Sequence, residues 1–175
     1  ISTNRKEETK IETRKVTRIM VLLIAIFCLG MNSSIVVNAA DELLGTSVDG
    51  SILTEDKEVI GTTLSNARGV YLSTGNGRLT NNGGGVVNVW GSTTCYKTSD
   101  QVKVKLYLQR LVGGTWSTVA TVDTKIAYNT NYVSNSKNIS VTGGYYYRIL
   151  GSHVAVKGKT TETTTSTTSG MWVSK

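Results

Sequence analysis

The sequence predicts an all-β fold, an antiparallel sandwich or barrel of about seven or eight short strands, from two observations. Apolar and polar residues alternate with a period of two along most of the chain after Gly69, as they do in strands that bury one face. Glycine clusters separate these runs, and glycine tolerates the positive φ angles of tight turns. The 175 residues provide room for about one domain.

The strongest strand signal is the alternation of Val and Leu with Lys, Tyr and Gln from Val102 to Gln109. The pair Gly113-Gly114 follows and predicts a hairpin into a strand over 115–122. The remaining strands are expected at shorter apolar runs bounded by turn residues, over residues 71–79, 86–90, 139–141, 145–156 and 170–173.

Residues 1–39 have the three parts of a secretory signal peptide. Residues 1–18 carry several lysines and arginines, Ile19 to Met31 form an apolar run, and Val37 and Ala39 suit the positions before a cleavage site. The apolar run is short for a membrane span, so we expect cleavage in preference to retention as an anchor. The protein is therefore expected to be secreted and extracellular, either released or associated with the cell envelope.

The charge distribution divides the remainder into an acidic leader, 40–65, and a basic β-sandwich domain, 66–175. Residues 41–65 contain six acids and one lysine, whereas residues 66–175 contain twelve basic side chains and three acids. The leader has few aromatic residues and no clear period, which favours a flexible spacer. A pro-segment or an intramolecular mask over the basic domain is the alternative.

Three strings are similar to a known group of domains: residues 102–110, the Gly-Gly-Thr-Trp-Ser-Thr-Val string at 113–119, and Gly-Gly-Tyr-Tyr-Tyr-Arg-Ile at 143–149. Over residues 68–174 the chain resembles uncharacterised small secreted domains of Gram-positive bacteria, which have an immunoglobulin-like β-sandwich pattern and no assigned activity. The resemblance implies an immunoglobulin-like sandwich, with Tyr145 or Tyr147 tied to a nearby backbone group as in a tyrosine corner. It implies no catalytic or binding residue.

Residue types that carry catalysis are few and scattered. Asp100, Asp123 and Glu162 are the acids of the basic domain, and their contexts are those of turn and surface positions. His153 is the one imidazole, and alternation places it on the buried face of its strand. Cys95 is expected to be a small buried apolar residue. We therefore expect no enzymatic activity, no cofactor and no metal site, and a small hydrolase is kept as an alternative.

A basic, tyrosine-rich sheet face is the candidate binding surface. If strands 102–110 and 145–156 are neighbours, one face presents outward-facing cations and rings: Lys103, Lys105, Tyr107, Tyr146 and Arg148, with Gln109 and Leu150. Cations interleaved with aromatic rings can hold anionic polymers. The expected partners are anionic polysaccharide, teichoic acid or another envelope surface, with nucleic acid also compatible, and an ordinary solvated face is the alternative.

The threonine-rich run Thr160–Ser169 predicts a solvated edge strand, or a flexible linker to the last strand. An edge of this kind can pair with the edge of another chain. A structural or self-assembling surface protein, joined through this edge or through Cys95, is therefore the second functional hypothesis.

Overall fold

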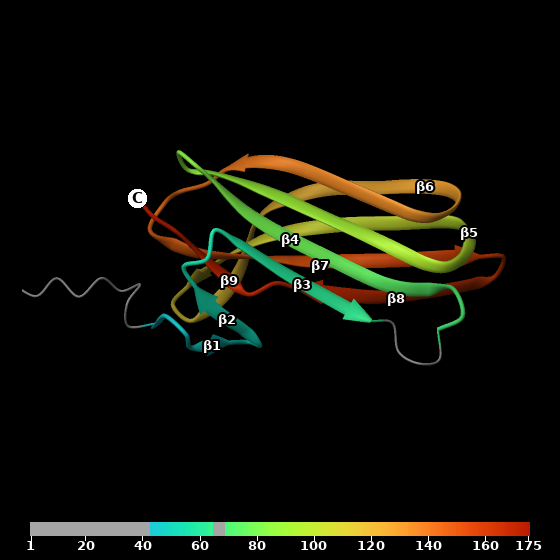
Figure 1. The fold of residues 1–175 in the computed structure, drawn as a ribbon, viewed down its shortest axis with the longest axis horizontal. Helices are drawn as coiled ribbons and strands as arrows, with labels where there is room; N and C mark the ends of the chain where they lie inside the picture. Colours follow the sequence, from blue (N-terminus) through green and yellow to red (C-terminus); the bar gives the residue numbers. More distant parts are fainter. Residues whose placement is uncertain (1–42, 65–68) are drawn as a thin grey trace, which may run out of the picture. The chain divides into compact units, whose positions relative to one another are not determined.

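The computed structural model describes residues 43–64 and 69–175, and every regular element in those ranges is a β-strand (Figure 1). The expected all-β fold is confirmed. The signal peptide predicted over residues 1–39 lies outside the described residues. The strands are β1 (Ser47–Val48), β2 (Ser51–Thr54), β3 (Glu58–Leu64), β4 (Leu72–Gly83), β5 (Val86–Val112), β6 (Thr115–Ser140), β7 (Tyr145–Lys157), β8 (Thr160–Thr167) and β9 (Gly170–Val173).

Two strands are much longer than the sequence predicted: β5 has 27 residues and β6 has 26. They are joined by the predicted turn at Gly113 and Gly114, both of which have positive φ. The runs 86–90 and 102–109, expected as separate strands, belong to the single strand β5. Pairing with β6 is irregular between Thr94 and Ser99, where β5 carries more residues than its partner. Such a bulge bends a strand without ending it.

The bend in β5 curls the sheet into a half-barrel. Strand β6 follows β5 on both sides of the bend, whereas β4 pairs with the first half of β5 and β7 with the second half. The two halves of β5 therefore lie in two facing layers, and Figure 1 shows both long strands turning back at one end. Since β2 pairs with β9 in parallel, the strands form one mixed, curled sheet and not two separate antiparallel sheets.

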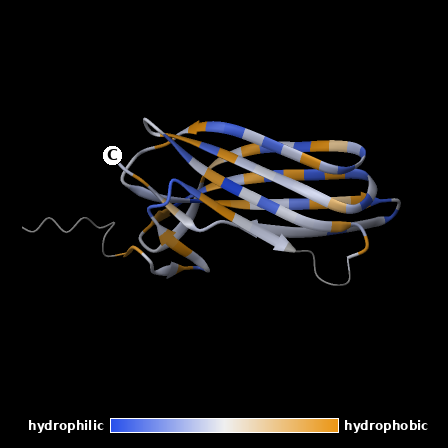
Figure 2. Ribbon diagram, in the orientation of Figure 1, coloured by the Kyte–Doolittle hydropathy of each residue, from blue (hydrophilic) through white to orange (hydrophobic). Residues whose placement is uncertain are grey.

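The hydrophobic core lies between the layers. Val102, Val104, Leu106 and Leu108 of β5 are fully buried, as the period-two pattern predicts. Figure 2 shows the same alternation as bands of opposite hydropathy along the strands.

A row of three glycines allows the layers to approach closely. Gly61, Gly77 and Gly91 lie in register on β3, β4 and β5. A Cβ atom at Gly61 would lie 2.1 Å from the carbonyl oxygen of Thr167, which belongs to β8. A side chain at that position would force the two layers apart.

His153 is a buried structural residue, as the alternation predicted. Its Nδ1 lies 2.9 Å from the Thr93 hydroxyl, and its Nε2 lies 2.8 Å from the Ser166 hydroxyl. Burial lowers the pKa of the imidazole to about 4, because the charged form would lose its hydration. His153 is therefore neutral near pH 7 and connects three strands, β5, β7 and β8.

The segment expected to be a flexible acidic leader differs from that expectation, because residues 47–64 contain three strands of the sheet, β1, β2 and β3. β1 and β2 form a hairpin that turns at Asp49 and Gly50, β2 pairs with β9, and β3 pairs with β4. Leu53 and Val59 are buried, whereas acids such as Glu55 remain exposed. The outward-facing acids dominate the composition, which is why the segment resembles a solvated spacer when only its sequence is considered.

Two smaller expectations are confirmed. The Tyr147 hydroxyl donates a hydrogen bond to the carbonyl of Thr142 at 2.7 Å, as the tyrosine-corner resemblance implied. Cys95 is buried and free, and burial raises the pKa of its thiol.

Candidate functional site

The outer face of the second layer is formed by β6, β5, β7 and β8 in register. The predicted adjacency of strands 102–110 and 145–156 is confirmed, with Lys105 opposite Ser152 and Tyr107 opposite Leu150. We call this surface the β5–β7 face. It comprises Lys103, Lys105, Tyr107 and Gln109 of β5, and Arg148, Leu150, Ser152 and Val154 of β7.

The β5 and β7 residues of this face include cations and a ring, and the neighbouring β6 adds one exposed acid, Asp123, in the stretch opposite Lys105. The Lys105 ammonium lies 5.1 Å from the centre of the Tyr107 ring, within the range of a cation–π contact. Lys103, Lys105 and Tyr107 are partly exposed. The strand on one border, β8, adds a regular row of exposed hydroxyls from Thr161, Thr163, Thr165 and Thr167. The expected edge strand in the threonine run is thus present as β8.

Tyr146 and Arg148, predicted to be presented to solvent, are buried instead. They lie on the outward side of β7, but their exposed fractions are 2% and 5%. The β1–β2 hairpin covers this end of the face, and Tyr146 packs in a second small core with Leu53 and Leu111. Alternation gives the side of a sheet to which a residue points, but a segment distant in sequence decides whether that side is covered.

The Arg148 guanidinium is held by partners on three sides. Its Nε donates to Gln109 Oε1 at 2.8 Å, and its Nη1 donates to the Ser51 hydroxyl and the Asp49 carbonyl. Its Nη2 lies 2.8 Å from the Asp49 carboxylate. The Trp116 ring lies 4.5 Å away and makes a cation–π contact. The acidic segment is therefore bound to the basic sheet through the Asp49–Arg148 ion pair.

A groove of about 520 Å³ opens beside this ion pair. We call it the Arg148 groove. It lies between the β1–β2 turn, the start of β6 and the end of the β5–β7 face, and it is lined by Asp49, Gln109, Gly114, Thr115, Trp116, Arg148, Leu150 and Thr167. The lining combines an aromatic ring with charged and amide groups, a combination typical of sites for polar ligands.

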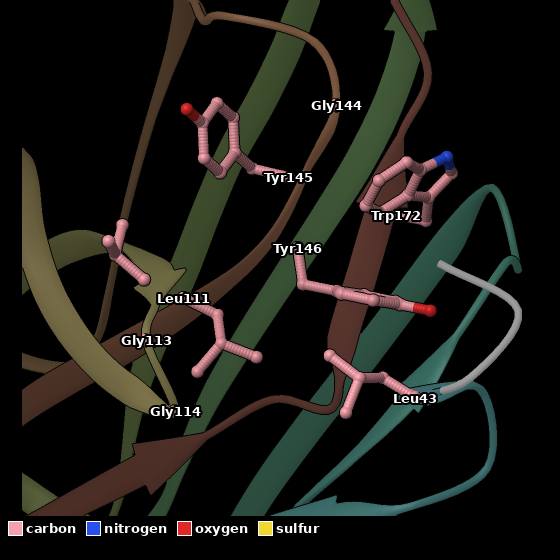
Figure 3. Close-up of a pocket in the computed structure, with 9 residues that line it drawn as sticks. Leu43, Leu111, Gly113, Gly114, Gly144, Tyr145, Tyr146 and Trp172 are labelled. Carbon is pink, nitrogen blue, oxygen red and sulfur yellow. The ribbon is translucent and has the colours of Figure 1, made fainter. Parts of the chain in front are cut away.

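A smaller, mainly apolar pocket of about 300 Å³ is also lined by the Gly113-Gly114 turn. Figure 3 shows the Tyr146 ring between Trp172 and Leu43, with Tyr145 projecting to the opposite side. The Tyr146 and Trp172 rings are tilted, with centres 4.9 Å apart. This pocket lacks charged lining residues and is thus separate in chemistry from the Arg148 groove.

Asp100 and Glu162, two of the three acids of the basic domain, have structural partners, whereas Asp123 is exposed on β6. Asp100 accepts hydrogen bonds from the Gly158 N–H and the Lys157 ammonium, which lower the pKa of its carboxyl. Burial acts to raise the pKa of Glu162, but N–H groups of Val70, Tyr71 and Leu72 bind its carboxylate and bring the pKa below its ordinary value.

These acids do not form an acid–base site with His153, whose ring is hydrogen-bonded to two hydroxyls. Within residues 43–64 and 69–175, no group of three or more His, Cys, Asp or Glu side chains could hold a metal ion.

Sequence reasoning missed Asp49 and Trp116. Asp49-Gly50 is a hairpin signal, because both residues of such a turn have positive φ, and it lies inside the segment treated as a spacer. Trp116 is the second residue of β6 after the predicted Gly113-Gly114 turn, and its indole Nε1 donates a hydrogen bond to the carbonyl of Val48 at 3.1 Å. Only the folded chain brings Asp49 and Trp116 to Arg148.

Residues 38–170 match a protein family described as a family of unknown function (DUF6147). A search of curated proteins found no match to this chain. Among the described residues, no helix has the length and apolar character needed to cross a membrane.

Proposed function

Since the chain belongs to the DUF6147 family of unknown function, we propose from its surface chemistry that it is a secreted, non-catalytic binding module. Its ligands are anionic polymers of the cell envelope or matrix, such as acidic polysaccharide or teichoic acid. The observation that carries this proposal is the β5–β7 face, where Lys103, Lys105 and Tyr107 stand in one partly exposed row. One acid, Asp123 of β6, lies in the stretch opposite Lys105.

The spacing of the row suits an extended polymer. Residues on one side of a strand recur about every 6.6–6.8 Å, so the two lysines present positive charge at a regular interval. Tyr107 adds a ring on which a sugar can stack. The threonine hydroxyls of β8 border the row and offer further hydrogen-bonding groups.

Secretion is supported by the composition of residues 1–39, and an origin in Gram-positive bacteria is supported by the resemblance of residues 68–174. The tyrosine-corner bond of Tyr147 supports a distant architectural relation to immunoglobulin-like sandwiches.

The test is retention of the full chain on immobilised polygalacturonate, with neutral dextran as the comparison. The double variant Lys103→Gln/Lys105→Gln is expected to lose retention. The affinity of the variant is also expected to depend less on salt: the plot of log affinity against log salt should become less steep by about two, by analogy with phosphate contacts in nucleic acids. Arg148 stays unchanged because it is buried and holds the β1–β2 hairpin.

The matched control is Lys57→Gln/Lys97→Gln, which changes the net charge by the same amount at two exposed lysines outside the β5–β7 face. Equal loss of retention in both double variants would show that only net charge matters, and the proposed face would then be wrong.

A further inference from the structure

We infer that the Arg148 groove binds one anionic group, a carboxylate or a phosphate carried by a sugar or polyol unit, through the Arg148 guanidinium beside Trp116 and in competition with Asp49. This inference rests on the proposed function and assigns a specific subsite at one end of the polymer-binding face.

The guanidinium is already oriented for such a ligand. The Arg148 side chain is only 6% exposed, yet it lines the groove. Gln109, Ser51 and the Asp49 carbonyl fix its plane, so little conformational freedom remains to be lost when a ligand binds. A planar guanidinium held in this way is well suited to an oxyanion.

The guanidinium also retains a donor. Arginine has five N–H groups, and the described residues accept four hydrogen bonds from Arg148. The unused N–H is on Nη2, the nitrogen that contacts the Asp49 carboxylate. An oxygen of an incoming anion can accept a hydrogen bond from this group.

Asp49 occupies the position of a competing anion. Its carboxylate contacts Nη2, but its side chain is 76% exposed and lines the groove. A ligand anion at Nη2 would be repelled by this carboxylate or would displace it. The Asp49 carbonyl and Ser51 bind the other terminal nitrogen, Nη1, so they can keep the hairpin in place when the carboxylate moves.

The location of the groove connects it to the rest of the polymer site. Leu150 lines the groove and lies opposite Tyr107 on the β5–β7 face. The volume of about 520 Å³ falls within the usual range for small-ligand sites and accommodates one sugar or polyol unit. One unit in the groove would place the following units over Tyr107, Lys105 and Lys103.

The experiment is a titration of the full chain, followed by tryptophan fluorescence, with trigalacturonate, with glycerol phosphate and with neutral maltotriose. Saturable binding of at least one acid, and none of maltotriose, is expected. Tighter binding of trigalacturonate would identify a carboxylate as the preferred group, and tighter binding of glycerol phosphate would identify a phosphate.

Asp49→Asn is the decisive variant, and Asp56→Asn is its matched control, since each removes one exposed carboxylate and only Asp49 lines the groove. We expect Asp49→Asn to raise the affinity for the short acid roughly two- to fivefold, and Asp56→Asn to leave it unchanged. Arg148→Lys is expected to abolish binding of the short acid, and near-ultraviolet circular dichroism would report whether that variant keeps its fold.

The subsite inference is overturned if neither acid binds, or if the two Asp variants bind the acid equally. Polymer retention of the Lys103→Gln/Lys105→Gln variant distinguishes failure of the subsite inference from failure of the proposed function. If Lys103→Gln/Lys105→Gln abolishes polymer retention while no short acid binds, the face is correct and the subsite is wrong. If short acids bind as expected but retention is indifferent to the lysine pair, the face is wrong and the groove acts alone.

Discussion

At the scale of single residues, His153 shows how burial changes the chemistry of the one imidazole in the chain. The sequence placed it on the buried side of its strand, and the structure adds two hydroxyl partners, Thr93 and Ser166. Gly75 packs against the ring so closely that a Cβ atom there would lie 2.2 Å from Cδ2. An imidazole held in this way is a packing element between the layers, and protonation of it would disrupt the core.

His153 therefore makes stability depend on pH. The pKa is about 4 in the folded state and near 6.5 when exposed, so between these values the unfolded chain binds the proton and the folded chain does not. Stability is highest above pH 6.5, falls as the pH decreases, and is lower by roughly 2 kcal/mol at pH 4.5. Urea unfolding at pH 7 and pH 4.5 measures this difference.

The control for this prediction is His153→Gln, which keeps a polar side chain but does not titrate. Its stability is expected to change much less between the same two pH values. An equal change in the variant and the natural chain would assign the pH dependence to other groups, such as Asp100 and Glu162, whose pKa values are also lowered.

At the scale of elements, β6 has 26 residues and pairs only with β5 among the described strands. Its other edge could in principle add a strand from another chain. Lys125 lies opposite buried Val104, and Lys137 lies opposite buried Val89, so both lysines stand on the inward side of β6, where they remain exposed at the rim of the layer. Inward-pointing charges on an edge strand oppose edge-to-edge pairing. This arrangement weighs against self-assembly through β6.

We expect the double variant Lys125→Val/Lys137→Val to associate in a concentration-dependent manner, because pairing of two β6 edges would no longer bury ammonium groups. Sedimentation velocity across a range of concentrations detects this association. Lys57→Val removes a lysine outside β6 and is expected to leave the sedimentation coefficient unchanged. If Lys57→Val also associated, the loss of charge, and not the loss of edge protection, would explain the association.

At the scale of the described β-structure, the half-barrel depends on the close approach of its two layers along the row Gly61, Gly77 and Gly91. The available space differs along the row. A Cβ at Gly61 would meet a backbone carbonyl at 2.1 Å, whereas one at Gly77 would lie 3.3 Å from the Ser166 hydroxyl. Backbone cannot rotate away as a side chain can, so the two positions should respond differently to the same substitution.

Gly61→Ala is therefore expected to lower the free energy of unfolding by roughly 1–3 kcal/mol or more, and Gly77→Ala by clearly less. Chemical denaturation of both variants gives the comparison. Equal losses would mean that the two layers can separate slightly without cost, contrary to the packing described here.

The sequence was sufficient for features that depend on local pattern. Alternation from Val102 to Gln109 identified the strand and its buried side, and Gly113-Gly114 identified the turn between the two longest strands. The sequence could not show that residues 90 and 105 belong to one continuous strand, because a strand bent at a bulge and two strands separated by a loop have similar composition.

By itself, then, the sequence determined the all-β class, the inward and outward sides of its clearest strands, and the positive row of Lys103 and Lys105, since these follow from side-chain spacing along a single strand. Tertiary structure alone decided that Tyr146 and Arg148 are covered and that Asp49 and Trp116 meet at a groove. Those contacts join the β1–β2 turn, β6 and β7, which are far apart in the chain, and no local stretch of residues carries a pattern that reveals this packing.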